Sequence, residues 1–154
     1  MENISFFADL FGEKGAEREQ RIEHLLQATG MARFVDRPAA KLSGGMKQKL
    51  AIACGFLHSP KVIFLDEPLT GLDPVGIRRM KNSILKRARD GAAIILSSHL
   101  LHLLEEVCSH VLILKSGQKI FDGTLGEVRQ KFSEQSAAAS LEDVFLRATE
   151  DAKS

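Results

Sequence analysis

The 154-residue sequence has few cysteines, almost no net charge and no long hydrophobic run. Two cysteines, each within a helical apolar pattern, argue against a disulfide framework and fit a reducing cytosol. A formal net charge of +1 lacks the basic excess that is typical of nucleic-acid binding. No apolar run reaches the ~18 residues of a membrane-spanning helix, and no signal-like segment opens the chain. If the protein functions at a membrane, we therefore expect it to be held there by a partner.

What the sequence does contain is typical of one α/β domain. Hydrophobic residues make up 44% and charged residues 27%, an ordinary globular mixture. Apolar residues recur at helical spacing at first, and later short apolar runs alternate with amphipathic segments. We therefore predict a helical subdomain over 1–57, part of a parallel sheet with flanking helices over 58–134, and a short linker (135–139) with a C-terminal helix over 135–154.

Local signals define the expected elements. Two short apolar runs, 61–65 and 92–96, have the character of buried parallel strands. Residues 111–114 and 119–121 flank Ser116-Gly117, which predicts a β-hairpin. Helices are expected over 2–11, 16–29, 43–57, 74–90 and 98–107, after Thr124 and after Ser140. The expected caps are Ser43, Asp73, Ser98, Ser140 and a capping box of Thr124 with Glu127, and Gly30 and Gly91 are expected to end helices.

Two carboxylates follow the first apolar run, in Val62-Ile63-Phe64-Leu65-Asp66-Glu67-Pro68. Ligands of open α/β sheets bind at the carboxyl edge of the strands. There Asp66 could hold a water-coordinated Mg²⁺ that bridges nucleotide phosphates. Glu67 could orient and deprotonate an attacking water. Apolar strands that end in acids are common, so the alternative is two solvated residues at a strand end.

A second signal is Leu42-Ser43-Gly44-Gly45-Met46. A serine N-cap followed by two glycines leaves backbone N–H groups exposed at a helix start, where the helix dipole adds partial positive charge. This pattern predicts an anion site. The alternative is a plain N-cap with flexible glycines, because Ser-Gly-Gly is a frequent loop signal.

A third signal is His99, which lies just past the second apolar run. If the two strands are neighbours, His99 shares the sheet edge with Asp66 and Glu67. An imidazole there could hydrogen-bond a γ-phosphate or hold the attacking water. A lone histidine at a helix start is more often structural, so its value depends on its place behind the strand.

Taken together, these segments and their order resemble the ATP-binding cassette (ABC) ATPase family. Leu42–Met46 is similar to the family's signature motif, and Val62–Glu67 to its Walker B strand with the catalytic glutamate. Leu72-Asp73 resembles the D-loop, and His99 the switch histidine. The tail Leu141–Leu146 resembles the drug-exporter and ABC-2-type branch.

The resemblance implies a partial P-loop NTPase fold and the ATP-binding, ATP-hydrolysing subunit of an ABC exporter, with ATP and Mg²⁺ as cofactors. Two ATPase domains would pair head to tail, as a homodimer or a heterodimer, and would drive a transmembrane permease subunit from the cytoplasmic face of the membrane. Nucleic acid is not an implied partner. A DNA-repair or chromosome-organising ATPase shares similar motifs, but the sequence has no long heptad segment.

The resemblance also implies a role for each motif residue. Glu67 and His99 would be catalytic, and Asp66 would hold Mg²⁺ through water. Ser43, Gly44, Gly45 and Met46 would bind the partner domain's ATP in trans. Asp73 would link the two nucleotide sites.

One family motif is missing from the sequence. A P-loop needs Gly-Lys followed by Ser or Thr, and none of the twelve glycines is followed by lysine. We therefore expect an N-terminally truncated domain that is inactive by itself and marginally stable, with partly uncovered strand edges. The alternative function is a non-catalytic interaction module that caps a partner's ATP through Ser43–Met46.

Overall fold

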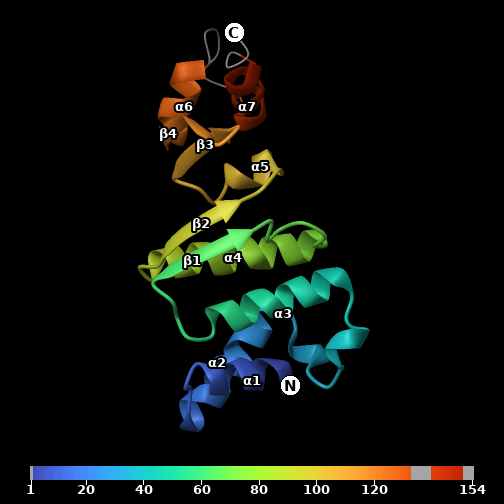
Figure 1. The fold of residues 1–154 in the computed structure, drawn as a ribbon. Helices are drawn as coiled ribbons and strands as arrows, with labels where there is room; N and C mark the ends of the chain where they lie inside the picture. Colours follow the sequence, from blue (N-terminus) through green and yellow to red (C-terminus); the bar gives the residue numbers. More distant parts are fainter. Residues whose placement is uncertain (1, 133–139, 151–154) are drawn as a thin grey trace. The chain divides into compact units, whose positions relative to one another are not determined.

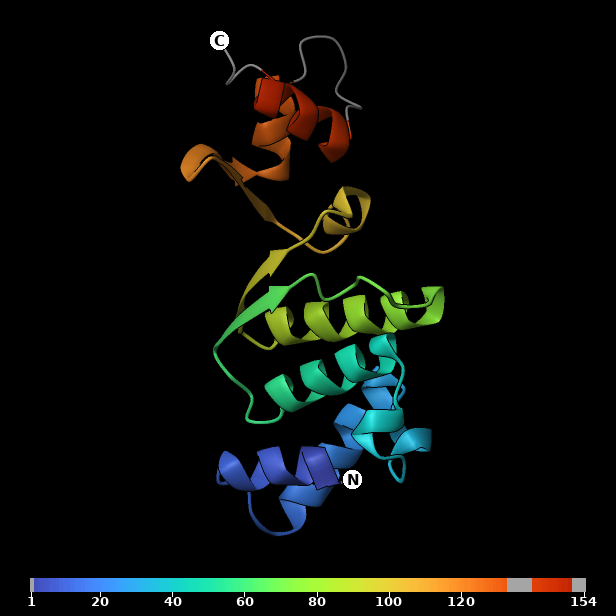
Figure 2. The same cartoon turned by 45° about the vertical axis from the view of Figure 1, so that its right-hand side comes forward.

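The computed structural model describes residues 2–132 and 140–150 of the chain (Figures 1 and 2). Two compact units divide between Ser98 and His99. The expected linker over 135–139 lies outside the described residues. The three-part division at residues 57 and 134 stays a prediction, because it separates subdomains by their type of structure and not by compactness.

Helices dominate the first unit. Its elements are α1 (Glu2–Leu10), α2 (Gly15–Thr29), the 3-10 turns η1 (Ala32–Phe34) and η2 (Ala39–Lys41), α3 (Gly44–Phe56), β1 (Val62–Asp66), α4 (Pro74–Arg89) and β2 (Ala93–Ser97). Figures 1 and 2 show α3 and α4 side by side, and α2 packs against both. The four helices expected in this part of the chain are confirmed, each end to within one residue. Gly30 ends α2 in the left-handed conformation (φ 74°), as expected.

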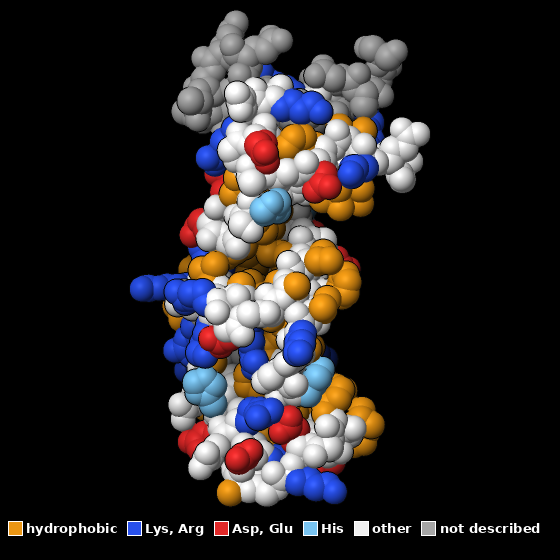
Figure 3. Space-filling view, turned by 90° about the vertical axis from the view of Figure 1, so that its left-hand side faces the viewer, with side chains coloured by type: hydrophobic (Ala, Val, Ile, Leu, Met, Phe, Trp, Pro, Cys, Tyr) orange, Lys and Arg blue, Asp and Glu red, His pale blue; other side chains and the backbone are white. Residues whose placement is uncertain are grey.

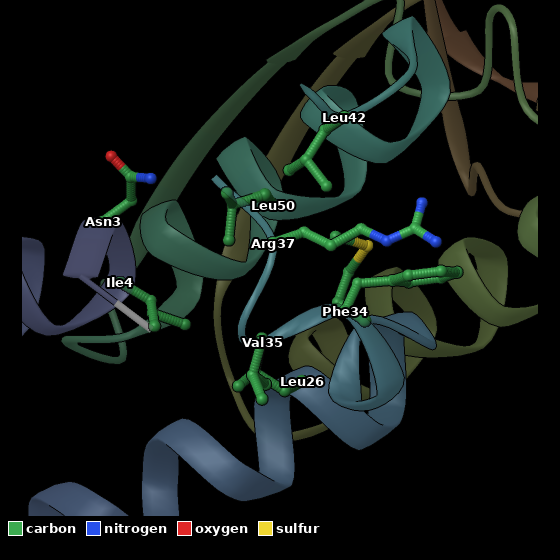
Figure 4. Close-up of a pocket in the computed structure, with 9 residues that line it drawn as sticks. Asn3, Ile4, Leu26, Phe34, Val35, Arg37, Leu42 and Leu50 are labelled. Atoms are coloured by element: carbon green, nitrogen blue, oxygen red, sulfur yellow. The ribbon is translucent and has the colours of Figure 1, made fainter. Parts of the chain in front are cut away.

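The side chains packed between the helices of the first unit leave only a small cavity among them. Ile4, Leu26, Leu42 and Leu50 lie around a cavity of about 20 Å³ (Figure 4). Such a volume holds a water molecule at most. This part of the first unit is therefore a packed core and not a ligand pocket.

Strands β1 and β2 pair in parallel, with Ile63 opposite Ile94 and Asp66 opposite Ser97. Ile63 is buried, but the alternate positions Phe64 and Ile95 are 73% and 57% exposed. The prediction of fully buried strands is therefore wrong for one face of this sheet. A parallel sheet is normally covered on both faces, and within the described residues of the first unit nothing covers this face. Hydrophobic side chains also reach the surface in the space-filling view of one side of the molecule (Figure 3).

The second unit is built on a hairpin. Its elements are α5 (Leu101–Leu104), β3 (His110–Lys115), β4 (Gln118–Thr124), α6 (Leu125–Phe132) and α7 (Leu141–Glu150). β3 and β4 pair antiparallel. The turn between them has positive φ at Ser116 (49°) and at Gly117 (77°), as a two-residue type I′ turn requires. The predicted hairpin is confirmed.

Both expected caps in the second unit are present. The hydroxyl of Thr124 accepts a hydrogen bond from the backbone N–H of Glu127 (3.2 Å), and the Glu127 carboxylate accepts one from the N–H of Thr124 (2.7 Å). Ser140 and Asp143 make the same reciprocal pair at the start of α7. These local bonds fix the two helices that pack against each other. The core of this unit consists of Ile113, Val128, Leu141 and Val144.

The expected helix after Ser98 is corrected by the structure. α5 spans only Leu101–Leu104, and Leu100 occupies the N-cap position. Ser98 does not cap it, because the Ser98 hydroxyl donates a hydrogen bond to the Glu67 carboxylate instead. Cys54 and Cys108 are both free thiols, as expected. Among the helices of the described residues, none combines the length and the hydrophobicity needed to cross a bilayer.

Candidate functional site

Asp66 and Glu67 lie where β1 ends, at the carboxyl edge of the β1–β2 pair. The parallel register brings Ser97 opposite Asp66, and the Ser97 hydroxyl donates a hydrogen bond to Oδ1 of that carboxylate. Asp66 is exposed, whereas Glu67 is half-buried. The pairing of two neighbouring strands thus presents two adjacent acids at the edge where α/β sheets bind ligands.

Glu67 has an unusual backbone conformation. Its φ of 47° is left-handed, which costs a non-glycine residue about 1–2 kcal/mol. The backbone N–H of Glu67 donates to the carbonyl of Ser97 at 3.0 Å, and its own carbonyl accepts from the N–H of Thr70 at 3.2 Å. The surrounding backbone therefore holds a conformation that Glu67 would not adopt in a free chain.

The side chain of Glu67 is held as well. Its Oε2 accepts hydrogen bonds from the hydroxyls of Thr70 (2.9 Å) and Ser98 (3.3 Å). The side-chain amide of Gln48 in α3 donates to the backbone carbonyl of Glu67 at 3.2 Å. Our sequence reasoning missed Thr70, Ser98 and Gln48 as partners of this glutamate. Thr70 alone carried a local signal, a hydroxyl three positions after the acid.

The expected N-cap at the start of α3 is present, whereas anion binding there stays a prediction. Ser43 is the N-cap residue, and its hydroxyl accepts a hydrogen bond from the backbone N–H of Met46 (3.4 Å). Ser43 and Gly44 are exposed, whereas Gly45 and Met46 are half-buried. A Cβ atom on Gly45 would lie 2.6 Å from the carbonyl oxygen of Gly71. Glycine is therefore required at residue 45 for α3 to approach the loop that follows β1.

Asp73 occupies the N-cap position of α4, ahead of Pro74 at the first turn, as expected. Its carboxylate forms no capping bond and instead accepts a hydrogen bond from Lys49 of α3 at 2.8 Å. This hydrogen bond, reinforced by the charge of Lys49, holds the pKa of Asp73 below its ordinary value. The loop from Glu67 to Asp73 is thus connected to α3 at residues 45, 48 and 49.

His99 is the first residue of the second unit, and it is exposed. Asp66, Glu67, Ser43 and Asp73 all belong to the first unit. The joint action of His99 with the two acids therefore stays a prediction. Within the first unit, Ser98 is the residue after β2 that reaches Glu67.

The donor set at the end of β1 suits magnesium in one particular way. Among the described residues, no group of three or more His, Cys, Asp and Glu side chains could enclose a metal ion. Mg²⁺ rarely needs such a cage, since it retains waters and binds through one or two carboxylates plus substrate phosphates. The exposed carboxylate of Asp66, beside Glu67, fits that mode.

Two grooves lie near these residues. One, of about 420 Å³, is lined mainly by apolar groups of α3 and β1 and includes Gln48 and Asp66. The other, of about 500 Å³, combines Arg33, Lys49 and Arg79 with Asp73. The first groove reaches the acidic end of β1, so the candidate site borders an apolar hollow.

Comparison with known proteins agrees with these features. The family model described as ABC transporter matches residues 1–70. The probable multidrug ABC transporter ATP-binding protein YbhF of Escherichia coli K12 is 40% identical over 123 residues, covering 80% of this chain and 21% of YbhF. The ABC-type transporter ATP-binding protein EcsA of Bacillus subtilis 168 is 34% identical over 151 residues, covering 98% of this chain and 60% of EcsA.

A solved structure described as the ATP binding subunit of an ABC transporter superposes with a TM-score of 0.87 at 34% identity. The match covers 96% of this chain and 61% of that structure. The chain therefore spans less than two thirds of the relatives and of the structure that it matches.

Proposed function

Because this chain belongs to the family of ABC transporter ATP-binding subunits, we propose that it supplies part of an ATP-hydrolysing site that drives transport. The observation that carries the proposal is the pair of acids at the end of β1, one of which is held by two hydroxyls. A positioned carboxylate of this kind can act as the general base that activates water.

Each residue of the candidate site has a proposed role. The Glu67 carboxylate orients the attacking water and takes its proton. The carboxylate of Asp66 holds Mg²⁺ through water. When bound, the ion would neutralise negative charge on the phosphates. His99 contacts the γ-phosphate or the attacking water. Ser43 and the N–H groups at the start of α3 cap the ATP of a partner domain.

The proposed partners follow from the proposed binding of another domain's ATP by the N-terminus of α3. Ser43 and Gly44 are exposed and free to meet a second ATPase domain, in a homodimer or a heterodimer. A permease subunit couples that pair to transport at the cytoplasmic face of a membrane. Within the pair of ATPase domains, Asp73 links the two nucleotide sites. The word multidrug in the name of YbhF supports an exporter.

The proposed activity belongs to an assembled ATPase, meaning this chain together with a Gly-Lys-Ser or Gly-Lys-Thr loop on the same or another polypeptide. Phosphoryl transfer is catalysed mostly by positioning and charge stabilisation. Since none of the twelve glycines in these 154 residues precedes a lysine, we expect no measurable turnover from the chain by itself. Turnover that disappears in Glu67→Gln would contradict this expectation.

The test of the base is Glu67→Gln in the assembled ATPase. ATP binding should be retained while hydrolysis falls by about 100-fold or more, which begins at the lower end of the range for a lost general base. Glu17→Gln is the matched control, because Glu17 is an exposed acid in the first turn of α2. Hydrolysis that is unchanged in Glu67→Gln removes Glu67 from this role.

A second candidate function is favoured by the same missing lysine. The chain could act as an interaction module that presents Ser43–Met46 to ATP bound by another ATPase. Adding the chain to an intact ABC ATPase should then change the turnover rate of that ATPase, and Ser43→Arg, which blocks the α3 N-terminus, should abolish the change. An unaltered rate excludes this candidate.

A further inference from the structure

The loop that follows β1 is connected to α3 at several places. Gln48 donates to the carbonyl of Glu67, Lys49 pairs with Asp73, and Gly45 lies against the carbonyl of Gly71. These three residues belong to the first turns of α3, whose N-terminus carries the proposed anion site. The helix that would meet a partner's nucleotide therefore also contacts the residues around Glu67.

Gln48 contacts the strained residue itself. Its amide donates to a backbone carbonyl 19 positions further along the chain, and the bond is partly buried. The left-handed φ of Glu67 is disfavoured for a side chain of this type. A hydrogen bond to the carbonyl of that residue fixes the orientation of the following peptide plane, which includes the link to Pro68. Removal of the amide should let Glu67 relax.

Thr70 and Ser98 hold the other end of the residue. Their hydroxyls donate to the same carboxylate oxygen, Oε2 of Glu67, one from the loop after β1 and the other from the residue after β2. A glutamate without such restraints samples several rotamers. Sampling of several rotamers lowers the rate of catalysis, because the reacting groups must be held in a near-attack geometry. Backbone and carboxylate are thus restrained by separate groups.

We propose that Gln48, Thr70 and Ser98 are positioning residues that hold Glu67 in its left-handed conformation with the carboxylate fixed at the end of β1. Through Gln48, this placement depends on α3. The inference rests on the proposed function in one respect, the role of Glu67 as the base. The restraint itself can be measured without turnover.

The first experiment observes the side-chain carboxyl ¹³C resonance of Glu67 in the 154-residue chain, assigned by its loss in Glu67→Gln. Gln48→Ala should shift this resonance and accelerate hydrogen exchange of the Thr70 amide by about fivefold, the factor for one lost hydrogen bond. Gln20→Ala is the matched control, since Gln20 is an exposed amide within α2 and should change neither signal. A Gln48→Ala spectrum identical to the wild type overturns the inference.

A second pair of variants tests the carboxylate side. Thr70→Val removes the hydroxyl with little change of shape and should shift the Glu67 resonance, whereas Thr70→Ser retains the donor and should restore it. This pair changes an exposed turn residue, so it supplies the test even if Gln48→Ala does not fold. A Glu67 carboxyl resonance that is the same in the wild type, Thr70→Val and Thr70→Ser also overturns the inference.

Turnover of the assembled ATPase separates the two proposals. Gln48→Ala and Thr70→Val should lower kcat by on the order of 10- to 100-fold, with KM for ATP within about twofold, because the base is misplaced while the phosphate contacts remain. If Glu67→Gln retains full turnover, the proposed function fails. If Glu67→Gln loses turnover while Gln48→Ala and Thr70→Val retain the wild-type kcat, the function stands and the positioning role is wrong.

Discussion

The side-chain nitrogen Nζ of Lys49 lies 2.8 Å from Oδ1 of Asp73, so α3 is paired with the residue that precedes α4. The Lys49 side chain is mostly buried, whereas that of Asp73 is largely exposed. The acid that a local pattern assigns to capping α4 is therefore used to connect two helices.

Lys49→Met should raise the pKa of Asp73 towards the ordinary value of about 3.9. The folded-state pKa is depressed by the bond from Lys49. The pair therefore contributes stability that is complete above the ordinary pKa and is lost as the pH falls through the lower folded-state pKa. A ¹³C titration of the Asp73 carboxyl measures the shift, with the exposed Lys47→Met as control. Identical titrations in wild type and Lys49→Met would contradict the pairing.

Two adjacent glycines should respond oppositely to alanine. Gly45→Ala places a Cβ 2.6 Å from the Gly71 carbonyl oxygen and should destabilise the chain by about 1–3 kcal/mol, as overpacking does. Gly44→Ala meets nothing within 4 Å and should stabilise it by about 0.5–1 kcal/mol through helix propensity. Urea unfolding of the two variants measures both changes. Equal effects at the two positions would mean that α3 does not approach the loop so closely.

Thr124→Ala should lower the stability of the second unit by about 1 kcal/mol, the usual effect of losing an N-cap. The substitution removes the hydroxyl that accepts from the Glu127 N–H at 3.2 Å. Gln130→Ala, at an exposed position of the same helix α6, should have little effect. Denaturant unfolding followed by circular dichroism gives the comparison, and equal losses in both variants would exclude the capping role.

Phe64→Thr should reduce self-association of the chain with little loss of stability. Phe64 is 73% exposed on the uncovered face of β1, where an apolar surface invites aggregation. Phe56→Ala is the contrasting variant, because Phe56 is 1% exposed and its truncation should cost about 3–5 kcal/mol. Light scattering and thermal unfolding distinguish the two. If Phe64→Thr unfolds the chain as Phe56→Ala does, the face is covered in solution.

The features that could be predicted from the sequence are those with local causes. Thr124 and Glu127 are three positions apart, and the Ser116-Gly117 turn depends on two residues, so both could be identified. Ser98 has the same local capping signal, but its hydroxyl bonds to Glu67, 31 positions away. A sequence pattern cannot weigh a local bond against such a distant one.

The parts that could not be predicted depend on tertiary arrangement. The apolar run of β1 indicates a strand, but the exposure of Phe64 depends on what packs over the sheet. The bond from Gln48 to Glu67 joins a helix to a strand end across 19 positions. The position of the two acids at the end of β1 could be predicted because they directly follow the apolar run that forms the strand. The joint action of His99 with them stays a prediction.

The bond from the Gln48 amide to the Glu67 carbonyl has a consequence for genetic selection. In a strain whose growth requires the proposed transport activity, a defect caused by replacing Gln48 should be relieved by second-site suppressors between residues 67 and 70. Substitutions such as Glu67→Gly would remove the strain but also the carboxylate, and a change at Thr70 risks the hydroxyl that holds it. Suppressors should therefore be recovered at Pro68 or Leu69.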